Sequence, residues 1–181
     1  YESQAAGRAG TAHVDLFNGN LVVEHADTVM NGNRMPVSVS HYYNSCLSKA
    51  AEGVDIYRCG HGWKHSGLQR IYETKIGSTS YYVWVDGDGT EHWFKDKGNG
   101  NKSPDEEGQQ LELTRYAASG TTPPRVEIVD KSHSKMVFQK RLSTANSGTW
   151  VDYWLIRAED ARGNTANYEY KKPANLDDSA A

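Results

Sequence analysis

Several features that would point to other classes of protein are missing from this sequence. The longest apolar runs are a handful of residues, far short of the roughly 20 that a helix needs to span a bilayer. The 23 acidic and 20 basic residues are mixed along the chain, and no basic stripe or arginine-rich run offers a site for a phosphate backbone. We therefore expect no membrane span in this chain and no nucleic-acid partner.

Phenylalanine is scarce, whereas the other aromatic residues are abundant. The chain has 3 Phe against 11 Tyr and 5 Trp. Tyrosine and tryptophan bury a large apolar body while keeping a polar group, which suits half-buried sheets, interfaces and sugar-binding faces. A disordered chain would lack these residues, so we expect a globular protein in spite of the mean hydropathy of -0.75.

Cysteine is also rare, and its spacing leaves two alternatives open. Cys46 and Cys59 lie 13 positions apart. Outside the cell they could close a small disulfide loop worth about 3 kcal/mol, or they could be two separate thiols. Neither belongs to a C-x-x-C motif, so we expect no redox or zinc role, and no cofactor is predicted.

Strand patterns dominate the rest of the chain. Segment 35–43 alternates apolar and polar residues at a period of two, which is typical of a half-buried strand. Further β-rich runs are 21–25, 63–73, 81–85, 91–95, 111–115, 126–129, 135–140, 150–157 and 167–171. Turn-forming Gly, Asn and Pro separate them, and no segment has convincing helical periodicity. The sequence predicts an all-β fold: an antiparallel sheet, a β-sandwich or part of a barrel.

The clearest local structure is a hairpin over 81–94, whose two runs are joined by Asp-Gly-Asp-Gly. An even-length loop would place Tyr81, Val83, Val85, His92 and Phe94 on one side, which we expect to face the core. It would place Tyr82, Trp84, Glu91, Trp93 and Lys95 on the other side, which we expect to be partly solvated or covered by another element.

The second side of this hairpin suggests a sugar-binding face. Tyr82, Trp84 and Trp93 could stack on sugar rings while Glu91 bonds to hydroxyl groups. The alternative is that these rings pack under a loop, which is the more common role of strand aromatics. A carbohydrate-binding module for cell-wall or plant polysaccharide is therefore the second functional hypothesis.

Other chemistry has weaker support. Segment 86–90 resembles part of a calcium loop but lacks the third ligand and the distal glutamate, and a hairpin turn explains the same residues. His61 and His65 have the i, i+4 spacing of a helical zinc pair, but glycines flank them and no third ligand is suitably spaced. No nucleophile elbow, phosphate loop or distinctive carboxylate pair is present, so we expect no enzymatic activity.

Four segments of the chain carry a recognisable pattern. They are GNLV at 19–22 with GNRMPVSVSHYYNS at 32–45, GWK at 62–64 with LQR at 68–70, VDGDGT at 85–90 with HWF at 92–94, and Ile156, Asp160, Gly163, Asn164 and Tyr168 to Tyr170. Together they resemble the region that opens a repeat array in RHS/YD-repeat bacterial cell-surface proteins. The tyrosine-aspartate dipeptide of the repeat is absent, since Lys171 follows Tyr170.

This resemblance implies an extracellular, non-catalytic structural or interaction module of a large secreted protein, whose strands form a hollow shell that in some members encloses a toxin. It implies structural roles for six residues: Gly87 and Gly89 in a turn, Trp63 and Phe94 in the core, and Gly163 and Asn164 in a repeat turn. The partner would be the remainder of the parent polypeptide. Segment 150–170 would then be loosely held without a downstream repeat.

Composition at the two ends predicts the domain organisation. Residues 1–10 and 173–181 are small and polar, as linkers are, and they suggest a module cut from something longer. We expect one β-rich module over 11–172.

Overall fold

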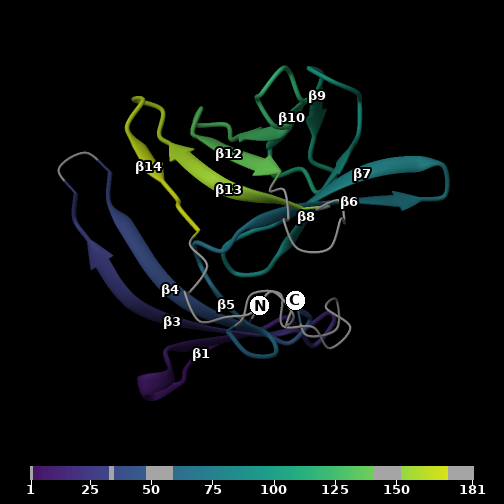
Figure 1. Cartoon of the computed structure of the whole chain (residues 1–181). Helices are drawn as coiled ribbons and strands as arrows, with labels where there is room; N and C mark the ends of the chain where they lie inside the picture. The colour runs from purple at the N-terminus through teal and green to yellow at the C-terminus, as the bar shows by residue number, and fades with distance from the viewer. Residues whose placement is uncertain (1, 33–34, 48–58, 141–151, 171–181) are drawn as a thin grey trace, which may run out of the picture.

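Two antiparallel sheets build the protein (Figure 1). The structure is a computed structural model that describes residues 2–32, 35–47, 59–140 and 152–170. Nearly all the regular structure in these ranges is β, joined by tight turns and one short 3-10 helix, η1 (Gly7–Ala9). The predicted all-β antiparallel fold is confirmed.

The smaller sheet has five strands in the order of the sequence. They are β1 (Glu2–Ala5), β2 (Thr11–Val14), β3 (Leu21–Met30), β4 (Val37–Asn44) and β5 (Trp63–His65). β1 lies inside residues 1–10, where a linker is expected from composition. Main-chain pairing with β2 holds this exposed strand, and such pairing needs no apolar side chain to mark it in the sequence. The linker expected over 173–181 lies outside the described residues.

The larger sheet has nine strands in the order β8-β7-β6-β13-β12-β11-β10-β9, with β14 paired to β13. Their bounds are β6 (Arg70–Ile76), β7 (Thr79–Val85), β8 (Glu91–Lys95), β9 (Lys102–Pro104), β10 (Glu112–Tyr116), β11 (Arg125–Val129), β12 (Lys135–Lys140), β13 (Asp152–Glu159) and β14 (Thr165–Asn167). The edge strands β8 and β9 meet through a bridge between Phe94 and Asp105, so the sheet curls into a nearly closed barrel.

The position of β13 differs from the expectation for segment 150–170. β13 is a central strand of the barrel, paired with β6 on one side and β12 on the other. Its side chains Tyr153 and Leu155 are buried. The expectation of a loosely held segment is therefore wrong for β13, because its pairing partners come from within the same chain rather than from a following repeat.

The barrel interior holds the main hydrophobic core. Its buried members are Ile71, Tyr82, Trp84, Phe94, Leu113, Val126, Ile128, Phe138, Tyr153 and Leu155. A second, smaller cluster forms on the outside of the barrel around Leu47 and Val85, with Leu68, Tyr72 and Trp154 packed against it. Side chains on both faces of β7 are therefore buried, since the strand lies between two apolar clusters.

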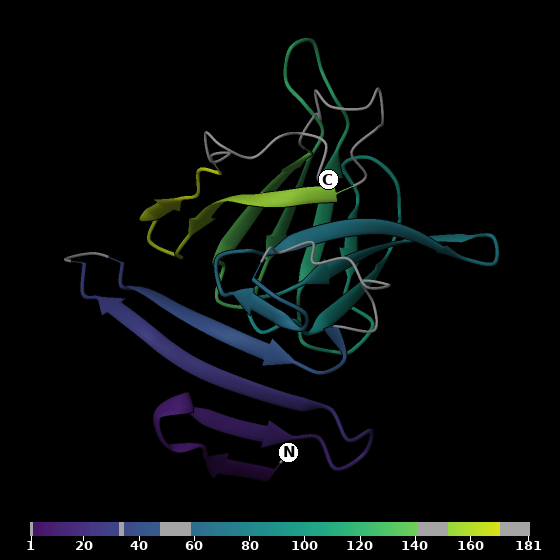
Figure 2. The same ribbon diagram turned by 60° about the horizontal axis from the view of Figure 1, so that its bottom comes forward.

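The small sheet lies beside the barrel, with β4 and β5 nearer to it than β1 (Figure 2). β5 is paired to β4, and the chain runs directly from β5 into the first barrel strand, β6. In the part of the chain that the structure describes, no helix has the length and apolar character needed to cross a membrane.

Candidate functional site

The turn between β7 and β8 is built around the carboxylate of Asp86. Its Oδ1 accepts hydrogen bonds from the main-chain N–H groups of Asp88, Gly89 and Thr90, at 3.1, 3.1 and 3.0 Å. Gly89 has φ +92°, a conformation that side chains of L-residues rarely adopt. The turn therefore requires glycine at position 89, whereas Gly87 lies in the same turn without a positive φ.

The hairpin register differs from the even-length loop assumed from the sequence. Val85 pairs with Glu91, so the loop has five residues and includes Thr90. Tyr82 is opposite Phe94 and Trp84 is opposite His92, and residues directly opposite each other share a face. Thr90 shifts the second strand by one residue, which exchanges its two faces.

The predicted sugar-binding face is consequently wrong. Tyr82 and Trp84 are 5% and 7% exposed inside the barrel, where the indole N–H of Trp84 donates to Gln69 Oε1 at 3.2 Å. Trp93 lies on the opposite face of the hairpin and packs edge-on against Tyr81. Three coplanar, solvent-accessible rings cannot form from this arrangement.

Glu91, the fourth residue of that prediction, accepts a hydrogen bond from the Tyr72 hydroxyl at 2.8 Å on the outer surface of the barrel. It shares this face with Trp93, away from the buried Tyr82 and Trp84.

A lysine from the small sheet enters this turn from the side. Lys64 of β5 is fully buried, and its ammonium donates to the main-chain carbonyl of Asp86. Burial lowers the pKa of Lys64 to about 8, while the nearby charges of Asp86 and Asp88 act in the opposite direction. A buried ammonium is costly unless it is hydrogen-bonded and near opposite charge, and both conditions are met here.

Asn44, at the end of β4, makes the second contact between the sheets. Its side chain is 2% exposed, and Nδ2 donates to the carbonyl of Asp88 at 3.3 Å. Its Oδ1 accepts from the N–H of Cys46 at 3.0 Å. A Cβ at Gly89 would lie 3.2 Å from Asn44 Nδ2, so the close approach of the two sheets also requires glycine at this position.

His92 completes the group from inside the barrel. Its Nε2 lies 3.1 Å from Asp86 Oδ2, and its ring stacks on Trp84 with centroids 4.7 Å apart. Burial opposes the charged form of His92, but the hydrogen bond and charge of Asp86 outweigh it and raise the pKa of the imidazole. Burial likewise opposes the charge of Asp86, yet the contacts to His92, Asp88 and Lys64 lower the pKa of that carboxyl.

We call Asn44, Lys64, Asp86, Asp88 and His92 the inter-sheet junction. Sequence reasoning did not select Asn44, Lys64 or His92 as functional residues, although all three lie inside or beside the segments GNRMPVSVSHYYNS, GWK and VDGDGT. Their grouping follows from pairing between strands far apart in the chain. The charged groups of the junction are hydrogen-bonded within the protein: both carboxylate oxygens of Asp86 and the ammonium of Lys64 have protein partners.

The remaining structural residues fall in three different environments. Phe94 is fully buried in the barrel core. Trp63, expected in the core, is instead 38% exposed and packs against Tyr43 at the surface, because alternation along β5 turns its neighbour Lys64 inward. Gly163, with φ +80°, and Asn164 lie in the turn between β13 and β14.

That last turn is held by Asp160, whose Oδ1 accepts from the N–H groups of Arg162 and Asn164 at 2.9 and 2.8 Å. The hydrogen bonds from Asn164 lower the pKa of Asp160.

The structure also bears on a disulfide bond and on a metal site. Cys46 and Cys59, both in the described ranges, are not joined by a disulfide bond. Within those ranges, no group of three or more His, Cys, Asp or Glu side chains is arranged to hold a metal ion.

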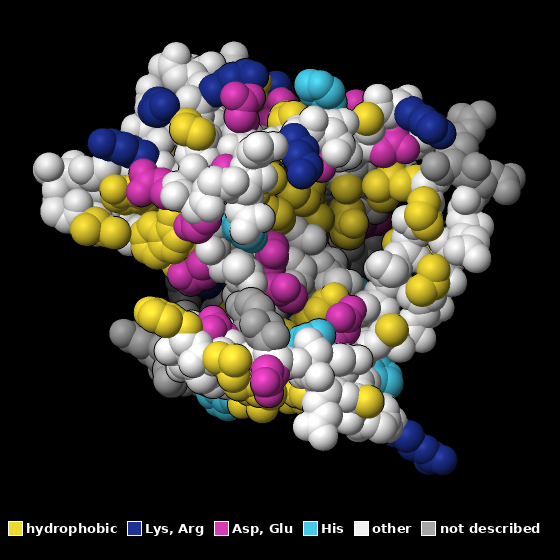
Figure 3. Space-filling view, turned by 180° about the vertical axis from the view of Figure 1, so that it is seen from behind, with side chains coloured by type: hydrophobic (Ala, Val, Ile, Leu, Met, Phe, Trp, Pro, Cys, Tyr) yellow, Lys and Arg dark blue, Asp and Glu magenta, His cyan; other side chains and the backbone are white. Residues whose placement is uncertain are grey.

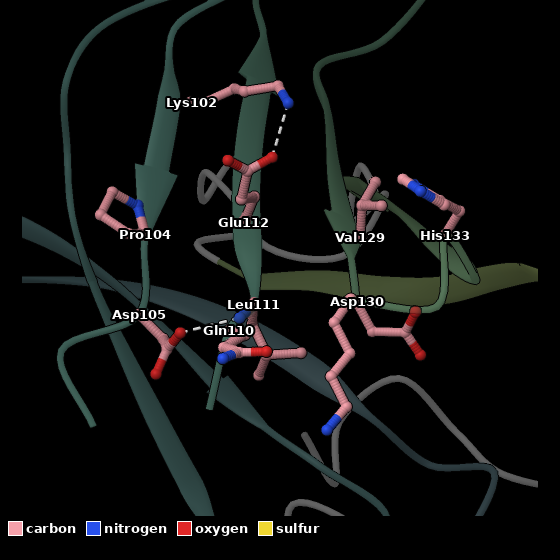
Figure 4. Close-up of a pocket in the computed structure, with 10 residues that line it drawn as sticks. Lys102, Pro104, Asp105, Gln110, Leu111, Glu112, Val129, Asp130 and His133 are labelled. Atoms are coloured by element: carbon pink, nitrogen blue, oxygen red, sulfur yellow. Dashed lines mark hydrogen bonds and ion pairs between the residues drawn. The ribbon is translucent and has the colours of Figure 1, made fainter. Parts of the chain in front are cut away.

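A cavity of 360 Å³ opens at the rim of the barrel, beside β9 and β10 (Figure 4). Its wall includes an ion pair between Lys102 and Glu112 at 2.5 Å. The carboxylates of Asp105 and Asp130 each accept hydrogen bonds from main-chain N–H groups of their own loop. These acidic groups stabilise the turns around the cavity.

Comparison with known protein families gives a match over part of the chain. Residues 11–94 match a family described as a domain of unknown function (DUF6531). The match runs from β2 to β8 and includes every residue of the inter-sheet junction. No curated protein matches the chain.

Proposed function

We propose that this chain is a non-catalytic structural and interaction module of a large secreted cell-surface protein of the RHS/YD-repeat kind. One observation carries the proposal. Three of the segments behind the resemblance, which contain Asn44, Lys64 and Asp86, meet at the inter-sheet junction. The module would hold the small sheet and the barrel in a fixed relation within the parent polypeptide.

The contacts at the junction favour a structural role over a chemical one. Lys64 and Asn44 both donate to main-chain carbonyls of the β7–β8 turn, and Asp86 accepts from main-chain N–H groups. Polar side chains used in this way satisfy buried main-chain groups and specify one arrangement of the chain. A substrate would have to displace these bonds to reach the charges.

The extracellular location and the larger parent rest on the resemblance. They can be tested by raising antibodies against this chain and probing the source cells. Intact cells and cells treated with an external protease are compared by immunoblotting.

The expected result is a band far larger than a chain of 181 residues that disappears when intact cells are treated with protease. A protected band of the size of the chain alone would overturn the proposal.

A further inference from the structure

A cavity of 260 Å³ separates the small sheet from the last strand of the barrel. Seen from behind, the molecule is hollowed between the two sheets, and both hydrophobic and acidic side chains lie along the hollow (Figure 3). Apolar side chains on both sides line the cavity, among them Pro36, Val37 and Val39 on one side and Ala166 and Tyr168 on the other. Among the residues that line it in the described part of the chain, none is Asp, Glu, Lys or Arg.

One wall of this cavity is an unfinished strand edge. β4 is paired with β3 over Val37–Asn44, whereas β5 is paired only with residues 41–43 of β4. Ser66 extends the pairing by one step, since its N–H donates to the carbonyl of Ser40 at 2.8 Å. Beyond that point the chain leaves β4 for the barrel, so among the described residues the first three residues of β4 are paired with β3 on one side and with no strand on the other.

The orientation of the main chain at this edge follows from strand geometry. Ser40 and Asn44 direct their main-chain groups toward β5, as their bonds to Ser66 and Gly62 show. Main-chain groups alternate sides along a strand, so Ser38 presents its N–H and C=O toward the same side. Within the described residues neither group has a hydrogen-bond partner. Ser38 also lines the cavity.

We infer that this cavity receives an extended, uncharged segment of the parent polypeptide, which adds to the edge of β4 as a further strand. The inference rests on the proposed function, which supplies the parent. Ser38 is exposed, so its main-chain N–H and C=O, which have no protein partner among the described residues, are open to pairing by β-strand addition. Since none of the described lining residues is Asp, Glu, Lys or Arg, apolar or small side chains are favoured at alternate positions of the added strand, facing Val39 and Ala166.

Main-chain hydrogen exchange is the first test, because a paired edge and an open edge differ in it. We expect the amide of Ser38 to exchange roughly tenfold more slowly, or slower still, in the intact secreted parent than in the 181-residue chain. An equally fast exchange in both would overturn the inference. If the source cells hold no larger polypeptide, the proposed function fails as well, whereas fast exchange in a proven larger surface protein defeats the added strand alone.

A photo-crosslinking amino acid at position 39 of the parent identifies the occupant. The expected product joins position 39 to a segment of the same polypeptide outside this chain. A crosslink to a second copy or to another protein would overturn the assignment.

The variant Val39→Asp places a charge in the cavity. It should abolish both the protection of Ser38 and the crosslink formed when the photo-crosslinking amino acid is placed at position 166, on the opposite wall of the cavity, instead of at position 39. Val29→Asp is the matched control: it lies on β3 directly opposite Ser38, is already 60% exposed, and should leave both signals unchanged.

Discussion

Replacing Lys64 by methionine removes a buried charge while keeping a side chain of similar length. The pKa of Lys64 is lowered by burial from 10.5 to about 8, a difference that costs the charged form about 3 kcal/mol. Methionine avoids that cost but leaves the Asp86 carbonyl without its donor, which costs about 1–3 kcal/mol. The two effects are of similar size, so at about pH 7 the free energies of unfolding should differ by less than about 2 kcal/mol.

The two proteins should separate as the pH rises. Because the folded pKa lies below the unfolded one, the unfolded chain binds more protons between these values, and stability rises with pH. Between about pH 7 and about pH 9.5, Lys64 should make the wild type more stable by about 2 kcal/mol, a gain that Lys64→Met lacks. The measurement is urea unfolding followed by tryptophan fluorescence at both pH values.

Lys75 provides the control, because it is an exposed lysine on the barrel strand β6. Lys75→Met should follow the wild type across the same pH range. Parallel pH profiles for the wild type and Lys64→Met would refute the argument, since they would mean that the ammonium is solvated in the folded protein.

Three further predictions concern the turn, the core and the histidines. Gly89→Ala and Gly100→Ala both place alanine at a positive φ, which costs about 1–2 kcal/mol, but only position 89 also meets a side chain, so urea midpoints should fall further for Gly89→Ala. Phe94→Ala should lower the free energy of unfolding by about 3–5 kcal/mol without abolishing the β-sheet circular dichroism signal, and a smaller loss would contradict its placement in the core. NMR titration should place the pKa of His92 above 6.5 and that of His65, lowered chiefly by burial, below it. His92 then adds stability to the folded protein that is lost as the pH rises through its folded pKa. His65 has the opposite effect, and its protonation lowers the stability of the folded protein as the pH falls through 6.5. Equal titration midpoints for the two histidines would contradict both assignments.

Strand content could be predicted from the sequence because period-two alternation is a local property. The hairpin over 81–94 was also predicted, but its faces were not, because a single loop residue, Thr90, decides which side chains point inward. β1 escaped prediction because an exposed, polar strand leaves no alternation to detect.

The candidate site could be predicted only in part. The turn at Asp86 is visible in the run of aspartate and glycine, whereas the burial of Lys64 is not. Lysine is almost never fully buried, and the carbonyl that accepts the hydrogen bond of Lys64 is 22 residues away in the sequence. Contacts of this kind depend on how two sheets are placed relative to each other, which no local pattern specifies.

The central position of β13 has a consequence for how the protein reaches its native state. Hairpins β6–β7–β8 and the run from β9 to β12 can form from neighbouring segments, but β13 joins them only after a separation of 80 residues, as between Glu73 and Tyr153. Closing so long a loop makes folding slow relative to local hairpin formation. A chain halted before Asp152 would leave the edges of β6 and β12 open to pairing with other chains. Barrel closure is thereby deferred until Asp152–Glu159 has been synthesised.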